Sequence, residues 1–276
     1  MPRRIEWLHR LAKEPPFRVL VRGFLSRVSA SVDTRALWEL SSRPAYLVGV
    51  LEAARQASRQ GVNSISTIEF GVAGGSGLLA LEREAAAVEA ETGVRIEVYG
   101  FDAGGLPQLI GDHRDHPDVW RAGDYPMDQA ALQSRLSSRT TLIIGNIKDT
   151  VPRFVERSGA SPVGFISIDV DLYSSARAAL EILSLPGKRM LHRVPLYFDD
   201  VASVFNHRYA GELLAINEFN SQEYGVKIDR WRGIANDRPF PERSFLSCMY
   251  VAHDLQAISE AKLAREPVHL PATPQA

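Results

Sequence analysis

Apolar runs and helical patterns alternate along most of this chain, and the alternation limits the folds open to it. Five strands are predicted, at residues 66–70, 95–101, 141–145, 164–168 and 193–198. Helices are predicted after them, at residues 78–91, 127–136, 152–158, 174–183 and 210–219. Such alternation favours parallel strands joined by crossover helices. Two later extended runs, 225–231 and 244–252, fit an antiparallel pair at the sheet edge. The sequence therefore predicts an α/β fold: a doubly wound, mostly parallel, seven-stranded sheet.

A glycine-rich turn, residues 71–77, joins the first predicted strand to its helix. Glycine lacks the Cβ that blocks close backbone approach, so such a turn brings main-chain atoms near a ligand. The start of the helix adds unpaired N–H groups and a positive dipole end. Glu69 stands two residues before the first glycine, where its charge would repel a pyrophosphate but suit a cation. The turn favours S-adenosylmethionine, which carries an ammonium and a sulfonium, although purely structural turns also use glycine.

Polar residues stand where the second and third predicted strands end. Asp102, one βαβ unit after the glycine turn, is placed to accept hydrogen bonds from ribose hydroxyls. A turn or helix cap is the alternative role for this aspartate. Asn146 follows the third strand, where its amide would border an adenine. The predicted cofactor contacts are Glu69, Gly71, Val72, Ala73, Gly75, Ser76, Asp102, Asn146 and Asp169.

Carboxylates stand where the fourth and fifth predicted strands end. Asp169 and Asp171 follow one strand, and Asp199 and Asp200 follow the other. A single crossover separates these strands, so their ends are expected to be neighbours. Crowded carboxylates repel one another unless a cation neutralises them, and hard oxygen ligands suit Mg²⁺ or Mn²⁺. We predict that Asp169, Asp199 and Asp200 hold a metal ion. The alternative for the whole group is that these carboxylates are solvated caps. The alternative for Asp171 is that it caps the following helix.

Composition excludes several classes of protein. With 45% hydrophobic and 24% charged residues, the chain is typical of a soluble globular protein. A net charge of −1 gives no reason to expect a nucleic acid or an anionic membrane as partner. Cys248 is the only cysteine, which excludes an internal disulfide and a CxxC zinc site. No secretory signal or membrane span is found, so a cytoplasmic location is expected.

Apolar residues recur at helical spacings over residues 33–61, and no strand is predicted within residues 1–62. We expect them to form an N-terminal helical extension that covers the cofactor or joins subunits of a homo-oligomer. Residues 63–262 are expected to form the catalytic domain, and residues 263–276 a loose tail. Within the extension, residues 17–28 form a basic amphipathic segment. Its charges are expected to be a solvated helix face, with a membrane-surface helix as the alternative.

With these motifs assembled, the chain resembles the class I S-adenosylmethionine-dependent methyltransferases, and more narrowly the macrocin O-methyltransferase family of metal-dependent sugar O-methyltransferases. The residues that carry the resemblance are Glu69-Phe70-Gly71-Val72 with Gly75, Gly100-Phe101-Asp102 with Gly105-Leu106-Pro107, Gly145 with Asp149-Thr150-Val151-Pro152, the run from Asp169 to Ser175, and Asp199-Asp200. The resemblance implies a Rossmann-like methyltransferase fold, metal ligands at Asp169, Asp199 and Asp200, and cofactor contacts in the glycine turn and at Asp102. The sequence departs from the family in a loop after Asp102 that is one residue shorter and in Val201, where an aromatic residue often follows the two acids.

The predicted reaction transfers the sulfonium methyl to a hydroxyl of a small-molecule acceptor, a sugar or another diol-bearing natural product. Asp169 and the ion it binds would activate that hydroxyl. His113, or His116 in the same loop, would take the proton, and Trp120 and Tyr125 would wall the acceptor. Alternatively, the two histidines are ordinary polar surface residues, and Trp120 and Tyr125 attach the loop to the core.

Two other functions share parts of this pattern. An NAD-dependent oxidoreductase also uses a glycine turn and an acid, but it leaves the aspartate cluster unexplained and puts Glu69 beside a pyrophosphate. A non-catalytic methyltransferase-like scaffold would bind the cofactor or a partner protein without turnover.

Overall fold

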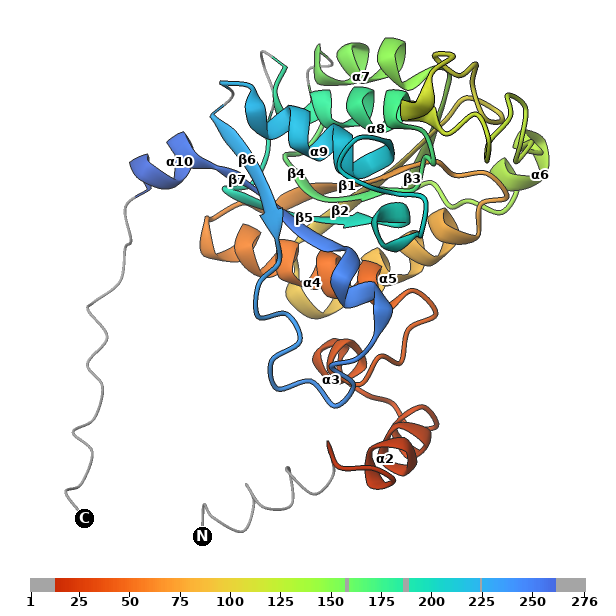
Figure 1. Ribbon diagram of the computed structural model, residues 1–276. Coiled ribbons are helices and arrows are strands. Elements are labelled where there is room, and N and C mark those ends of the chain that lie inside the picture. The colour runs from red at the N-terminus through yellow and green to blue at the C-terminus, as the bar shows by residue number, and fades with distance from the viewer. Residues whose placement is uncertain (1–12, 157–158, 186–188, 224, 262–276) are drawn as a thin grey trace, which may run out of the picture.

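The computed structural model describes residues 13–156, 159–185, 189–223 and 225–261, and the predicted C-terminal tail lies outside these residues. One seven-stranded sheet forms the centre, in the order β3-β2-β1-β4-β5-β7-β6 (Figure 1). The strands are β1 (Ser64–Phe70), β2 (Arg95–Asp102), β3 (Thr140–Ile144), β4 (Val163–Ile168), β5 (Arg193–Phe198), β6 (Val226–Arg230) and β7 (Met249–Asp254). Strands β1 to β5 pair in parallel, and β7 runs antiparallel to both β5 and β6. The predicted α/β class and the mostly parallel seven-stranded sheet are confirmed.

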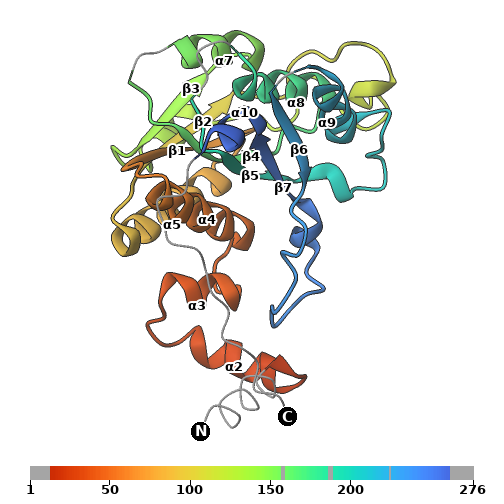
Figure 2. The same cartoon turned by 90° about the vertical axis from the view of Figure 1, so that its left-hand side faces the viewer.

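Helices cover both faces of the sheet, as the strand–helix alternation predicts. On one face lie α4 (Pro44–Arg59) and α5 (Ser76–Thr92), and on the other lie α7 (Ile147–Glu156), α8 (Tyr173–Leu180) and α9 (Gly211–Ser221) (Figure 1). The short helices are α2 (Phe17–Leu25), α3 (Val32–Leu37), α6 (Gln129–Gln133) and α10 (Leu255–Glu260). Figure 2 shows α2 and α3 beyond α4 and α5, on the side away from the sheet. Four 3₁₀ helices are described: η1 (His113–Asp115), η2 (Glu181–Leu183), η3 (Asp200–Ala202) and η4 (Ser244–Cys248).

Helix α4 belongs to the core of the α/β domain, although it precedes the first strand. It packs against β1, β4 and β5, and Tyr46 and Leu47 are fully buried. Gly49 makes the approach possible, because a Cβ there would lie 2.2 Å from the ring of Phe165 on β4. Burying one such ring contributes about 1.5–3 kcal/mol. Helix α4 is thus an integral layer on one face of the sheet.

Two predicted boundaries are wrong. Helix α7 begins at Ile147 rather than at Pro152, which lies inside it. Asn146 starts the helix: its Oδ1 accepts the Lys148 N–H at 3.1 Å, and its carbonyl accepts the Thr150 N–H at 3.0 Å. The predicted end of this helix, at residue 158, lies outside the described residues. The run predicted as one strand over 244–252 is instead the 3₁₀ helix η4 followed by β7.

The basic side chains of α2 face the rest of the protein, so the expectation of a solvated basic face is wrong for Arg18 and Arg22. Arg18 donates to the Pro239 carbonyl at 2.9 Å, and Arg22 donates to the Glu39 carbonyl at 3.1 Å. Both guanidinium groups lie over the ring of Phe240, at 5.0 and 6.0 Å from its centre. Such pairs contribute about 0.5–1 kcal/mol each at exposed sites. Among the residues described, no helix is long and apolar enough to cross a membrane.

Candidate active site

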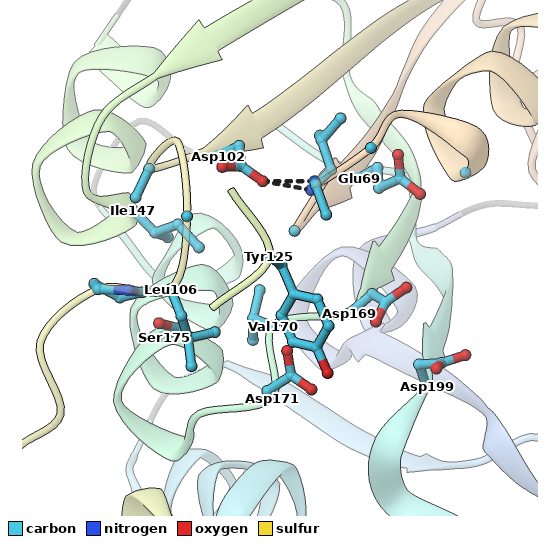
Figure 3. Close-up of a pocket in the computed structure, with 18 of the residues that line it drawn as sticks. Glu69, Asp102, Leu106, Tyr125, Ile147, Asp169, Val170, Asp171, Ser175 and Asp199 are labelled. Carbon is cyan, nitrogen blue, oxygen red and sulfur yellow. Dashed lines mark hydrogen bonds between the residues drawn. The ribbon is translucent and has the colours of Figure 1, made fainter. Parts of the chain in front are cut away.

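A cavity of about 360 Å³ opens at the carboxyl ends of the central parallel strands (Figure 3). Strand order reverses between β1 and β4, and ligands of doubly wound sheets bind at such a point. The predicted site residues on its wall are Glu69, Gly71, Val72, Ala73, Ser76, Asp102, Asn146, Asp169, Asp199 and Asp200. The fold therefore gathers most of the candidates, taken from five separate strand ends, around one space.

The glycine turn has the backbone conformation that only glycine adopts easily. Gly71 has φ +85°, and a Cβ there would lie 1.7 Å from the Asp169 carbonyl oxygen. Gly75 has φ +82° at the start of α5, and its Cβ would meet Leu132 at 2.2 Å. Gly75 is not among the residues that line the cavity. The first of these glycines lets the ends of β1 and β4 approach each other, which brings Asp169 beside the turn.

Asp102 organises the turn from within. Its Oδ2 accepts the N–H groups of Val72 and Ala73, each at 2.8 Å, and its Oδ1 accepts the Gly104 N–H at 2.6 Å. The first two bonds are the dashed lines of Figure 3. A carboxylate has about four lone-pair positions, so one position is left for a ligand. Asp102 thus shapes the turn, and its predicted contact with a ribose stays a prediction.

Glu69 lies beneath the turn and is almost completely buried. Its Oε1 accepts the Tyr46 hydroxyl at 2.6 Å, and that hydroxyl accepts the Ser167 hydroxyl at 2.9 Å. Its Oε2 is buried without a partner. Burial raises the pKa of Glu69 to about 8. At neutral pH the carboxyl is therefore mostly protonated in this structure, which weakens the argument that its charge selects the cofactor.

Four aspartates share the cavity wall next to Glu69. Burial, reinforced by Asp199 and Asp200, raises the pKa of Asp169 to about 7. Burial, reinforced by Asp200 and Asp169, raises the pKa of Asp171 to about 8. Asp171 also has a left-handed backbone conformation, φ 59°, which places its carboxyl on the wall. These side chains act on one another electrostatically, as their positions at the ends of adjacent strands predict.

Nothing in the described part of the chain forms a ready metal centre: no group of three or more His, Cys, Asp and Glu side chains is arranged to hold an ion. Asp199 instead accepts the Tyr197 hydroxyl. The donor set nevertheless fits a hard divalent ion. All of its candidate donors are carboxylate oxygens, and Oδ2 of Asp200 is buried without a hydrogen bond. Burial, with the charge of neighbouring aspartates added to it, raises the pKa values of Asp169 and Asp200, and a bound cation would lower them again.

Arg43 carries the only cationic side chain among the described residues that line the cavity. It stands just before α4, and its guanidinium lies 5.6 Å from the centre of the Tyr46 ring. Arg43 lowers the pKa values of both Asp169 and Glu69, but by less than burial raises them. Six carboxyl groups share the wall with this single guanidinium. Acidic side chains therefore outnumber basic ones on the wall, although the Glu69 carboxyl is mostly protonated at neutral pH.

The long loop after β2 forms the outer wall, through Leu106, Trp120 and Tyr125. Figure 3 shows the Tyr125 hydroxyl pointing toward Asp171. His113 is exposed in η1 and is not among the lining residues, so the structure does not bring this candidate base to the cavity. His116 is 5% exposed and also lies off the lining.

Asp115 ties this loop to α8, a role that the sequence analysis missed. Its Oδ1 accepts the Ser174 N–H at 2.8 Å, and its Oδ2 accepts the Ser174 hydroxyl at 2.8 Å and the Ile110 N–H at 2.9 Å. The residue is fully buried. Because its main partner lies 59 residues away, no local signal in the sequence marks it.

Comparison with solved structures identifies the fold. CalS11, a calicheamicin methyltransferase, matches with a TM-score of 0.51 over 87% of this chain and 93% of its own, at 19% sequence identity. The chain has the Rossmann-like fold of the class I methyltransferases. The O-methyltransferase NovP matches with a TM-score of 0.47 over 64% of this chain and 71% of its own, at 16% identity, which is too weak a likeness to support a conclusion. Comparisons with protein-family models and with curated protein sequences give no match.

Proposed function

We propose that this protein is an S-adenosylmethionine-dependent methyltransferase that methylates a hydroxyl of a small-molecule acceptor with the help of a divalent ion. The observation that carries the proposal is the single cavity in which a glycine turn adjoins a cluster of aspartates. The narrower resemblance to the macrocin O-methyltransferase family belongs to the proposal, as does an acceptor that carries a diol.

The roles of the residues follow from their positions on the cavity wall. The glycine turn and Asp102 would hold the cofactor, with Asn146 at the adenine end. Asp169, Asp199 and Asp200 would hold the ion, which when bound supplies positive charge to lower the pKa of an acceptor hydroxyl. By holding the ion, these side chains would position the acceptor hydroxyl for the transfer. We assign the proton to one of the cavity carboxylates rather than to His113, because His113 is exposed and lies off the wall.

Two features argue against NAD. The turn N–H groups of Val72 and Ala73 already donate to Asp102, so they are not free to bind a pyrophosphate. The aspartates of the wall would also repel it wherever they are ionised. The scaffold alternative predicts the same cofactor binding without turnover.

The test is a calorimetric titration of chelator-treated protein with S-adenosylhomocysteine, repeated with Mg²⁺, with Mn²⁺ and with NAD. We expect micromolar binding of S-adenosylhomocysteine, and Mg²⁺ binding that is lost in Asp199→Asn and Asp200→Asn. Asp149→Asn, an exposed aspartate near the start of α7, is the matched control and is expected to keep Mg²⁺ binding. Binding of NAD in preference to S-adenosylhomocysteine would overturn the proposal. Cofactor and metal binding with no methyl transfer to any of a panel of catechols and sugar diols would favour the scaffold.

A further inference from the structure

Six rings form a continuous row that begins on the cavity wall and runs outward. Trp120 lies 6.0 Å from Tyr125 and 5.7 Å from Phe205, measured between ring centres. Phe205 lies 5.5 Å from His116, which lies 5.9 Å from His207. His207 in turn lies 6.1 Å from Tyr209. Two loops far apart in sequence, the one after β2 and the one after β5, together build this row.

Both loops that carry the aromatic row are fixed to the domain. Asp115 bonds the first loop to Ser174 at the start of α8. In the second loop, Asn206 is buried, and its Oδ1 accepts the Leu213 N–H at 3.4 Å. Gly211 has φ +59° and lies so close to the Asn206 side chain that a Cβ would clash at 2.6 Å. Each loop is therefore fixed to the domain by a residue next to a ring of the row, Asp115 beside His116 and Asn206 beside Phe205.

The aromatic row has unsatisfied groups that the proposed reaction does not use. Nε1 of Trp120 and Nε2 of His116 are buried without a hydrogen-bond partner, and the His116 side chain belongs to a residue that is only 5% exposed. An unpaired buried polar group is unfavourable, and a side-chain shift that brought a ligand oxygen to either nitrogen would relieve that cost. Beside them, Val204 is 100% exposed and Tyr209 is 73% exposed. A surface that combines exposed apolar groups with unpaired polar atoms marks a binding site.

The orientation of the rings indicates what the row binds. Phe205 meets Trp120 at an interplanar angle of 87° and His116 at 70°, both edge-to-face. A ligand ring could add a further contact of this kind to the row, because aromatic rings favour edge-to-face and offset stacking with one another. An aliphatic polyol has no ring of its own and can meet an aromatic face only through its C–H groups. The apolar rim thus favours an acceptor with a flat aromatic part.

We propose that the aromatic row binds an aryl group of the acceptor while the methylated hydroxyl reaches the aspartates, so that the acceptor is an aryl diol or carries an aryl substituent. This inference rests on the proposed function for the identity of the reacting hydroxyl. The row shares Trp120 and Tyr125 with the cavity, and its ligand is testable by binding alone.

The experiment compares two diols by calorimetry, with the protein saturated with S-adenosylhomocysteine and Mg²⁺ and again without either. The probes are 2,3-dihydroxynaphthalene and cis-1,2-cyclohexanediol. We expect the naphthalenediol to bind at least about tenfold more tightly, and Phe205→Leu, which keeps the apolar volume, to weaken it by about 3- to 10-fold. Phe24→Leu, an exposed ring on α2, is the matched control and should leave the affinity unchanged.

The outcomes separate the two proposals. Failure of S-adenosylhomocysteine to bind would overturn the proposed function, while the titration without cofactor still tests the row. Equal binding of the two diols, or tighter binding of the cyclohexanediol, would overturn the aryl assignment, and so would a Phe205→Leu protein with unchanged affinity. Trp120→Phe keeps a ring but removes the indole N–H, and it should weaken the naphthalenediol less than Phe205→Leu does.

Discussion

The hydroxyl of Tyr46 donates a 2.6 Å hydrogen bond to Oε1 of Glu69, and both residues are almost completely buried. The bond joins α4 to the end of β1 directly beneath the glycine turn. A Cβ at Gly77 would lie 2.0 Å from the same oxygen, so α5 also packs against this carboxyl. One acidic side chain thus connects the N-terminal helical region, the first strand and the start of the helix after the turn.

Glu69→Gln is expected to remove a pH dependence from the stability of the protein. Burial raises the pKa of Glu69 from 4.5 to about 8, so between these values the folded state holds a proton that the unfolded state has lost. The contribution of this bound proton to the free energy of unfolding is fully present below pH 4.5 and is lost as the pH rises through 8. Over this window the wild type should lose stability relative to the variant by up to about 1.4 kcal/mol per pH unit.

Urea unfolding at pH 5, 6.5 and 8 in the presence of a chelator measures this difference. Glu156→Gln, an exposed position at the end of α7, controls for the loss of a carboxylate as such. A difference between wild type and Glu69→Gln that stays constant over this range would contradict the assignment.

Gly71→Ala is expected to destabilise the protein by about 3 kcal/mol or more, because strain at positive φ adds to a steric clash. A Cβ at this position would lie 1.7 Å from the Asp169 carbonyl oxygen, and a backbone atom cannot move aside as a side chain does. Gly74→Ala is the matched control in the same turn, since a Cβ there meets nothing within 4 Å. Chemical unfolding of the two variants compares them directly. Similar stabilities of the two variants would show that the turn is not constrained as the structure indicates.

Much of the fold was predictable because strand formation here depends on local patterns. Each parallel strand is a short apolar run, and its end coincides with a change to glycine or acidic residues. The positions of Asp102, Asp169 and Asp199 on the cavity wall follow from that pattern alone, because parallel strands bring their carboxyl ends to one edge. The start of α7 was missed because Pro152 favours a first turn, whereas the cap formed by Asn146 begins the helix earlier.

Features that depend on distant contacts were not predictable. The protonation of Glu69 follows from its burial under α4, and sequence gives no measure of burial at a single acidic residue. The aromatic row needs the rings of Phe205 and Trp120, which 85 positions of sequence separate, to lie 5.7 Å apart between their centres. The bonds from the turn to Asp102 were likewise hidden, because an acid at a strand end suits a ribose and a turn equally well.

Asp102→Asn is expected to destabilise the protein without any cofactor present. The carboxylate accepts three backbone N–H groups, and an amide in its place turns its own NH₂ toward at least one of these donors. Loss of such bonds to a charged acceptor costs about 1.5–3 kcal/mol. Urea unfolding of the cofactor-free protein gives this value, with Asp149→Asn as the exposed control. A variant of wild-type stability that binds S-adenosylhomocysteine weakly would instead assign Asp102 to the ligand alone.

Asp115→Asn is expected to release the loop that carries Trp120 and Tyr125. The buried carboxylate accepts the N–H and hydroxyl of Ser174 and the N–H of Ile110, and an amide cannot accept all three. Amide hydrogen exchange over residues 106–125 should therefore quicken by at least about tenfold, since one lost bond of about 1.4 kcal/mol changes a local opening equilibrium by that factor. Asp112→Asn, whose exposed side chain pairs only with Arg114 in the same loop, should leave exchange at Ile110 and Ser174 unchanged.

Because the loop supplies half of the aromatic row, Asp115→Asn should also weaken the binding of 2,3-dihydroxynaphthalene while leaving S-adenosylhomocysteine bound. Unchanged exchange in Asp115→Asn would mean that other contacts hold the loop in place.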